Sequence, residues 1–348
     1  MDASIALILA QDGITTGAVY ALLAVGLVLV FAVTQVIFIP QGEMVAYGAL
    51  TIATMQTGVF PSTAWLLLAM GAAVFAMDLW NWLRRATVPT DPGTLARSAL
   101  FNLAWPTLAC VLLKTLPIQT LALPVQVLLT LAVVAPIGPM LYRLAFEPLA
   151  QSSVLVLLIV SVGVHFALTG LGLYFFGAEG YRNPSFWDER FNLGPLTLSG
   201  QTLIVFAVSI ALIVMLWLFF ERTLWGKALR ATAVNRLGAR LMGISSTSAG
   251  RLSFTMAAFI GALSGLLIGP TTTVFYDSGF LIGLKGFVAA VLAGLASYPL
   301  ALVGALGVGL LESFGSFWAS SFKEVIVFSA ILPVLLWRSL RDPHGEEH

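Results

Sequence analysis

Charged residues are scarce in this sequence. They make up 9% of its 348 residues, whereas hydrophobic residues make up 59% and the mean hydropathy is +0.97. A soluble domain has about a quarter of its residues charged. The composition therefore excludes an ordinary soluble protein and predicts an all-α, polytopic transmembrane helical bundle with the lipid bilayer as its surroundings. The net formal charge of +1 gives no reason to expect a nucleic-acid partner.

Cysteine and histidine are almost missing. Cys110 is the only cysteine, which rules out an internal disulfide. His165, His344 and His348 are far apart in the sequence and form no cluster spaced for a metal ion. No Lys or Arg precedes Arg84, so the N-terminus lacks the basic region of a cleavable signal peptide. We expect the first helix to stay in the membrane.

Catalytic motifs are also lacking. The only Gly-Lys pair, Gly226-Lys227, has Glu221 where a phosphate-binding loop needs its first glycine, and Ala228 where it needs Ser or Thr. The metalloprotease pattern H-E-x-x-H and the nucleophile elbow G-x-S-x-G do not occur. We therefore expect no enzyme, no catalytic residues and no cofactor or metal held by this chain.

What the sequence does contain is a series of apolar runs, and a full membrane crossing needs about 20 residues. The runs at 43–59 and 283–297 are short, so we expect broken or re-entrant helices there, shielded by protein or by a water-filled cavity. The series predicts ten to eleven spanning or partly spanning helices in a single domain, 1–348. The runs fall at about 13–34, 43–59, 61–82, 99–116, 122–141, 153–176, 201–220, 252–270, 283–297, 301–319 and 323–338.

Proline and glycine mark bends and close contacts within these runs. Pro136 and Pro139 should kink the run 122–141. Glycines four residues apart in 13–17 and in 261–269 allow helices to cross closely, although such spacing is common by chance in a glycine-rich chain.

The basic residues indicate which ends of the helices face the cytoplasm. If the N-terminus is outside and every run crosses, 12 of the 17 Lys and Arg residues fall on the cytoplasmic side. The C-terminus is then cytoplasmic. The longest outer loop, 178–200, is either a docking surface for an extracytoplasmic partner or a folded cap. The 12 residues are Arg84, Arg85, Arg97, Arg143, Arg222, Lys227, Arg230, Arg236, Arg240, Arg251, Arg338 and Arg341.

The stretch 221–251 is the one long polar interval, with six basic residues and a single acid. Its Ala and Leu content and lack of proline predict a helix from Gly226 to Met242 that ends at Gly243. On a helical projection Val234, Leu237 and Leu241 share one face, and Thr232, Asn235 and Ala239 lie opposite. Such a helix is too short and too charged to cross the bilayer. It either meets a soluble partner or is a basic loop on anionic lipid.

Ionisable residues at membrane depth are costly unless they are paired or hydrated. Lys285 and Glu312 fall in the same outer half, where they can form an ion pair that either lines the solute pathway or only braces the helices. Glu43 follows Pro40 and Gly42, as at a broken-helix transport site. The alternative is a carboxylate stabilised by a helix dipole. We interpret His165 as a hydrogen-bonded packing residue.

Four stretches resemble the LivH-type permeases of branched-chain amino-acid ABC importers. They are 12–49, LYRLAFEPL (141–149), ALRATAVNRLGARLMGIS (228–245) with the glycine-rich helix after it, and 276–313. The resemblance implies a second homologous permease, two ATP-binding subunits and an extracytoplasmic solute-binding protein as partners, in a bacterial inner membrane. ATP would be bound by the partner subunits.

The resemblance also implies site residues. The family's ATPase-coupling helix corresponds to Ala231–Gly243. The candidate pathway, argued from the ionisable residues and the interrupted helix start above, contains Gln41, Gly42, Glu43, Lys285 and Glu312. Residues 38–43 read FIPQGE where the family usually reads N-F-A-H-G-E, which leaves the solute open. The expected coupling residues are Arg230, Ala231, Ala233, Asn235, Arg236, Gly238, Arg240, Leu241 and Gly243.

Residues 60–120 look like extra length relative to the family, as two added helices joined by an inner loop at 84–97. We expect a permease for branched-chain or related small amino acids. Urea, short amides or aromatic acids are alternative solutes, and a stand-alone secondary transporter is an alternative class.

Overall fold

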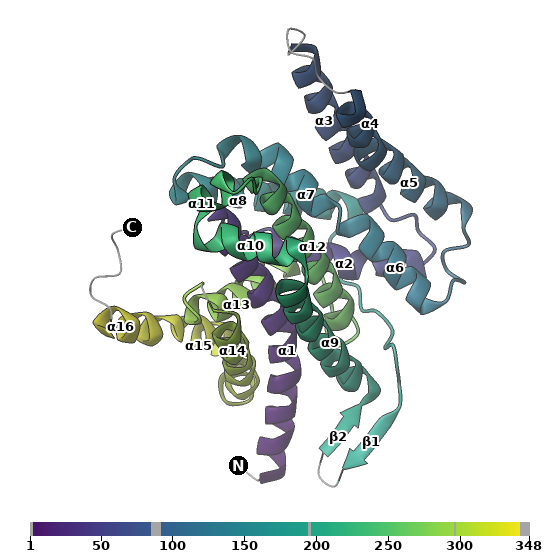
Figure 1. Ribbon diagram of the computed structural model, residues 1–348. Helices are drawn as coiled ribbons and strands as arrows, with labels where there is room; N and C mark the ends of the chain where they lie inside the picture. Colours follow the sequence, from purple (N-terminus) through teal and green to yellow (C-terminus); the bar gives the residue numbers. More distant parts are fainter. Residues whose placement is uncertain (1–2, 85–91, 194–195, 296, 342–348) are drawn as a thin grey trace.

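The computed structural model describes residues 3–84, 92–193, 196–295 and 297–341. Helices dominate it, as predicted, with one small two-stranded sheet that was not expected (Figure 1). The elements are α1 (Ala3–Thr34), α2 (Gln41–Gln56), α3 (Thr63–Arg84), α4 (Pro92–Ala99), η1 (Leu100–Ala104), α5 (Trp105–Thr115), α6 (Leu123–Val134), α7 (Ile137–Leu141), η2 (Tyr142–Phe146), η3 (Glu147–Leu149), α8 (Val154–Phe176), β1 (Arg190–Leu193), β2 (Leu196–Ser199), α9 (Gly200–Arg222), α10 (Leu224–Val234), α11 (Arg236–Leu241), α12 (Ser246–Ile268), α13 (Ser278–Leu292), α14 (Tyr298–Ala319), η4 (Ser320–Phe322), α15 (Lys323–Ser329) and α16 (Ile331–Arg341).

Eight helical segments of the described residues are long and apolar enough to cross a membrane. The 16-residue α2 and the 15-residue α13 are shorter. Together they match the predicted ten to eleven spanning or partly spanning helices, and the helices in the runs at 43–59 and 283–297 are the short ones, as expected.

The first helix is the centre of the bundle. It packs against α12, α13 and α14, and its middle, from Ala18 to Val30, is almost entirely buried because it is apolar on every side. Gly13 and Gly17 lie directly on the backbone of α14, which confirms the close crossing that their spacing suggested. Gly261 and Gly265 of α12 lie equally close to the backbone of α2.

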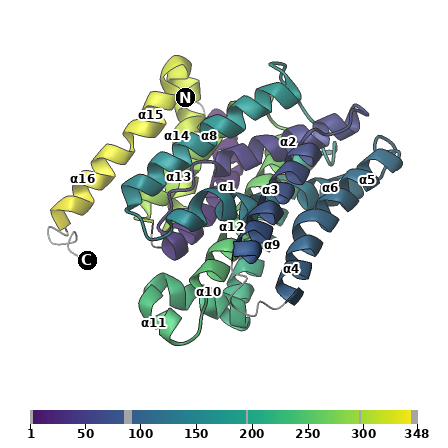
Figure 2. The ribbon, with the colours of Figure 1, turned by 90° about the horizontal axis from the view of Figure 1, so that it is seen from above.

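Two of the predicted runs are interrupted. The helix at 122–141 breaks at Pro136, where α6 ends and α7 begins, as its prolines predict. The last run divides into α15 and α16, and α16 leaves the bundle (Figures 1 and 2). The C-terminal residues 342–348 lie outside the described part.

The segments 63–84 and 92–115 form a helical hairpin whose α3–α4 end projects from the body, while α3 and α5 pack against α6 and share its buried core (Figures 1 and 2). One arm is α3 and the other is α4, the π-helical turn η1 and α5. The second arm begins at Pro92, so the predicted loop at 84–97 is shorter than expected; its residues 85–91 lie outside the described part. That this hairpin is additional to the family's fold stays a prediction.

The predicted outer loop contains the antiparallel hairpin of β1 and β2, in which Arg190 pairs with Ser199. The hairpin sits beside the N-terminal part of α1, where Gln11 Nε2 donates to the Thr197 carbonyl at 3.1 Å. In Figure 1 this end of the molecule is opposite the end that carries α10 and α11. The structure thus has two distinct ends, and the candidate functional residues are divided between them.

Candidate functional site

A buried cationic side chain, Lys285, is the centre of a charged cluster at the β-hairpin end. Its Nζ lies 2.5 Å from Glu312 Oε1 and 3.1 Å from Glu324 Oε1. Tyr20 donates its hydroxyl to Glu312 Oε2 at 2.6 Å. The predicted ion pair between Lys285 and Glu312 is therefore confirmed, although its role in transport is untested.

The cluster lies in a cleft of about 870 Å³ that the β hairpin partly covers. Polar groups from α1 and α9 and apolar side chains from α9, α12 and α13 form its walls. Three members of the cluster carry formal charge, two carboxylates against one ammonium. The cleft therefore offers an acceptor for a cation, a donor for an anion and an apolar wall within one cavity.

Two members of this cluster escaped the sequence analysis. Glu324 follows Lys323 at the start of the run 323–338, where it looks like a charged helix end, and Tyr20 lies within the run 13–34. Their assignment requires the packing of α14 and α15 around α13, which sequence spacing does not reveal. The intramembrane position of Glu312 was the available signal, because such a carboxylate needs several donors.

A second buried polar pair joins α2 to α8. Glu43 Oε1 and His165 Nδ1 are 2.9 Å apart, and the Glu43 side chain is completely shielded from solvent. Glu43 stands in the first turn of α2, as the helix-dipole interpretation expected, and His165 is a hydrogen-bonded packing residue as predicted. Neither residue lines the 870 Å³ cleft.

The start of α2 is held by very close packing. At Gly42 an added Cβ would lie 2.1 Å from the Gly279 carbonyl oxygen, so only glycine fits at this crossing of α2 and α13. Gln41 is buried beside Gly26 and donates to the Leu23 carbonyl at 3.1 Å. The predicted pathway residues therefore separate: Lys285 and Glu312 line the cleft, whereas Gln41, Gly42 and Glu43 are packed in the bundle.

At the opposite end, the predicted helix from Gly226 to Met242 is not continuous. Asn235 is extended (φ −152°, ψ 101°) and divides it into α10 and α11. Its Oδ1 accepts a hydrogen bond from the Gly238 amide at 2.8 Å, which caps α11. Asn is a preferred N-cap residue, so Asn235 was a possible signal for a new helix start. The Ala and Leu content around it instead predicted a continuous helix. Gly243 has φ +82° and ends the helix as predicted.

The two faces expected for this segment are separated for five of the six residues that the projection placed. Thr232 and Ala239 are buried, whereas Val234, Leu237 and Leu241 are 84%, 69% and 80% exposed. Asn235, expected opposite the apolar face, is exposed. The segment thus presents a row of large apolar side chains away from the body.

The arginines of the segment differ in their surroundings. Arg230 pairs with Glu221 at 3.0 Å, and the Arg240 Nε donates to Ser246 Oγ at 3.1 Å. Arg236 is half-buried, and burial lowers its pKa from the ordinary value. Its Nη2 has no partner among the described residues.

Two long helices connect the ends. The first residues of α9, Gln201 and Thr202, line the cleft, and its last turn leads directly into α10. α12 returns from α11 and ends at the cleft with Ile268. Gln201 Nε2 donates to the Leu267 carbonyl at 3.0 Å, so the two helices are tied together at the cleft.

Among the described residues, no three His, Cys, Asp or Glu side chains are grouped so that they could hold a metal ion. A membrane-crossing bundle with a charged cleft at one end and an exposed helix pair at the other has the architecture of a membrane permease.

Residues 94–336 match the family described as the permease component of branched-chain amino acid transport systems. This match spans most of the chain, and the chain belongs to that family. It is a multi-pass membrane transport component and not an enzyme.

Similar proteins span nearly the whole chain. The high-affinity branched-chain amino acid transport system permease protein BraD of Pseudomonas aeruginosa is 26% identical over 334 residues, which cover 94% of this chain and 92% of that protein. LivH of Escherichia coli K12, the permease protein of the corresponding system, is 24% identical over 339 residues, with 93% and 91% covered. Among solved structures, PsaBC from Streptococcus pneumoniae in complex with Fab covers 93% of this chain and 90% of that chain, at 14% identity and a TM-score of 0.39.

Proposed function

We propose that this chain is the transmembrane permease subunit of a binding-protein-dependent ABC importer, which moves branched-chain or related small amino acids by alternating access driven by partner ATPases. The observation that carries the proposal is the connection of the charged cleft to the exposed helix pair through α9 and α12. A displacement of α10 and α11 by a partner acts on two helices whose other ends form the cleft wall. Rigid movement of packed helices is a common way of switching access.

In this proposal α10 and α11 are the ATPase contact. Exposed apolar side chains such as Leu237 and Leu241, with arginines beside them, are the composition expected at the centre of a protein interface. The coupling residues that the family resemblance implies lie on these two helices, at Asn235 between them and at the turn that follows them.

The cleft supports a zwitterionic solute. The Lys285 ammonium suits a solute carboxylate, and Glu312 and Glu324 suit a solute ammonium. Apolar lining residues, among them Val205 and Ile282, suit an aliphatic side chain. The structure of the cleft therefore favours amino acids over neutral urea or short amides.

The remaining parts of the proposal concern the assembly. The chain works beside a second homologous permease, with two ATP-binding subunits that hold the ATP and an extracytoplasmic binding protein that delivers the solute. It lies in a bacterial inner membrane with the N-terminus outside and the C-terminus cytoplasmic. The basic stretch 221–251 then faces the cytoplasm, and the bias of basic residues is the argument for this orientation.

The test is uptake by proteoliposomes that contain the chain together with the ATPase and permease subunits that co-purify with it. We expect uptake of labelled leucine or valine. This uptake should require ATP on the side of the membrane that carries the ATPase subunits, and binding protein added on the opposite side. Uptake by the chain alone that needs no ATP and collapses with a protonophore would identify a secondary transporter instead. ATP-dependent uptake of urea with none of leucine would overturn the solute assignment and leave the importer class intact.

A further inference from the structure

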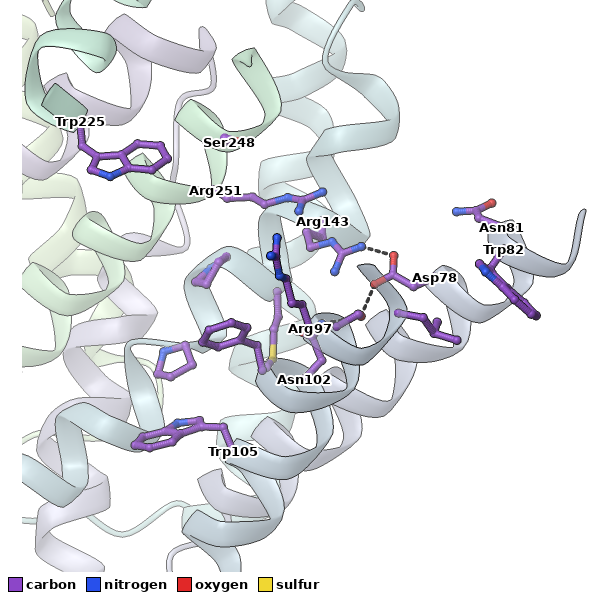
Figure 3. Close-up of a pocket in the computed structure, with 16 residues that line it drawn as sticks. Asp78, Asn81, Trp82, Arg97, Asn102, Trp105, Arg143, Trp225, Ser248 and Arg251 are labelled. Carbon is purple, nitrogen blue, oxygen red and sulfur yellow. Dashed lines mark hydrogen bonds and ion pairs between the residues drawn. The ribbon is translucent and has the colours of Figure 1, made fainter. Parts of the chain in front are cut away.

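A large cavity lies between one part of the α3–α5 hairpin and the body of the protein, which are in contact elsewhere through α6 and α7. It measures about 1130 Å³ and is lined by residues from α3, α4, α5, α7, α10 and α12 (Figure 3). Trp225 and Ser248 place it at the end of the molecule that carries the basic stretch 221–251. The cleft described above, at the other end, shares no lining residue with it.

Three arginines approach this cavity from three different elements. Figure 3 shows Arg97, Arg143 and Arg251 reaching toward the same space. Arg143 forms an ion pair with Asp78. The Arg251 Nη2 lies 2.9 and 3.0 Å from the two Glu147 carboxylate oxygens.

Arg97 has no hydrogen-bond or ion-pair partner among the described residues. The lining contains three arginines and one aspartate, and Glu147, which binds Arg251 from outside the lining, leaves a single positive charge in excess. Arg97 is exposed, so its unpaired guanidinium is open to an anion through charge-assisted hydrogen bonds.

The remaining lining is aromatic and apolar. Trp82, Trp105 and Trp225 surround the charged groups, as tryptophan does at membrane interfaces. From Phe101, which also lines the cavity, exposed apolar side chains continue along α5, with Phe101, Leu108 and Val111 at 68%, 49% and 55% exposure. The basic, tryptophan-lined cavity suits the headgroup of an anionic phospholipid, and the adjoining apolar helix face suits its acyl chains.

We propose that this cavity binds the headgroup of an anionic phospholipid, with Arg97 as the main contact to the phosphate and the acyl chains lying along α5. Basic pockets between membrane helices are known to bind anionic headgroups. The apolar face of α5 distinguishes this ligand from a free phosphate ion, which would use only the upper part of the site. The bound lipid would fill the space between hairpin and body and so fix the hairpin's position.

The test measures binding of phosphatidylglycerol and of phosphatidylcholine, each with a fluorophore on an acyl chain, to the full-length chain in neutral detergent. We expect Arg97→Gln to weaken phosphatidylglycerol binding about fivefold, the factor that corresponds to ~1 kcal/mol per basic residue near a membrane surface. Phosphatidylcholine binding should stay unchanged, and Arg97→Lys should retain most of the affinity for phosphatidylglycerol.

The matched control is Arg222→Gln, because Arg222 is exposed at the same end and lies outside the cavity lining. Preference for phosphatidylglycerol that is lost in Arg97→Gln and kept in Arg222→Gln supports the proposal. Equal loss in both variants would indicate unspecific charge attraction and overturn it. Competition by millimolar inorganic phosphate as strong as that by unlabelled phosphatidylglycerol would reassign the site to a soluble anion, and equal binding of the two lipids would also overturn it.

Discussion

His165 and Glu43 are 122 residues apart in the sequence, yet His165 Nδ1 and Glu43 Oε1 lie 2.9 Å apart in the interior of the bundle. The other carboxylate oxygen of Glu43 has no partner among the described residues. The imidazole is therefore a hydrogen-bond partner of a fully buried carboxyl group, and it ties α8 to the start of α2.

Replacing His165 with Phe should destabilise the protein by about 3 kcal/mol, because the change leaves a buried carboxyl group without its partner. The thermal unfolding midpoint in detergent measures the effect. The double variant Glu43→Gln with His165→Gln should recover much of the loss, since two neutral amides can bond to each other. An unchanged midpoint in His165→Phe would show that the contact does not stabilise the fold.

Replacing Lys285 with Met should lower ATP-dependent uptake at least ~tenfold, because Glu312 and Glu324 lose the cation between them and a solute carboxylate loses its donor. The informative comparison is the double variant Lys285→Met with Glu312→Gln. If the cluster binds solute, the double variant inserts and folds but stays inactive. Full recovery of uptake would show that the pair only braces α13 against α14.

Much of this fold follows from hydrophobic runs, because each run must bury its backbone polar groups in a helix. The two short runs, the break at Pro136 and the helix end at Gly243 all come from local chemistry, and each is found. The break at Asn235 was missed. Residues on both sides of Asn235 favour a helix, but its side chain caps α11 with a hydrogen bond to the Gly238 amide and its own backbone is extended. The β hairpin was missed because its strands have only four residues each, which is too short for a clear alternating pattern.

The candidate site was less accessible to sequence reasoning. Lys285 and Glu312 could be paired because a membrane penalises isolated charges at depth. The third and fourth partners, Glu324 and Tyr20, depend on how helices far apart in the chain pack around α13. The location of Glu43 away from the cleft is likewise a result of packing, which no spacing along a single chain determines.

Gly42→Ala should destabilise the bundle by ~3 kcal/mol or abolish insertion, because a methyl group there would collide with the backbone of Gly279. Gly163→Ala, on α8, is the matched control, since no atom lies within 4 Å of an added Cβ at that position. The yield of folded protein and the unfolding midpoint measure both variants. If the two variants behave alike, α2 and α13 do not cross as closely as the structure shows.

Leu241→Asp tests whether the exposed apolar row contacts a partner. The side chain is 80% exposed, so the substitution should change the stability of the isolated chain by less than ~0.5 kcal/mol. If an ATPase covers it, the same change should cost ~2 kcal/mol or more of binding free energy. Co-purification of the ATPase with the variant measures this. Normal recovery of the complex would place the ATPase contact elsewhere.

Replacing both Arg236 and Arg240 with Glu should uncouple ATP hydrolysis from uptake while membrane insertion stays normal. The half-buried Arg236 guanidinium has an Nη2 without a partner in the described residues, and reversal of two charges places carboxylates where an anionic partner group would bind. The control with the same change of charge is Arg222→Glu with Lys227→Glu, which precedes the segment Ala231–Gly243 on the same end. Uptake and ATPase rates in proteoliposomes separate the cases: the control should transport normally, and the test variant should hydrolyse ATP without solute movement. Full uptake by the test variant would mean that these two arginines do not transmit the work of the ATPase.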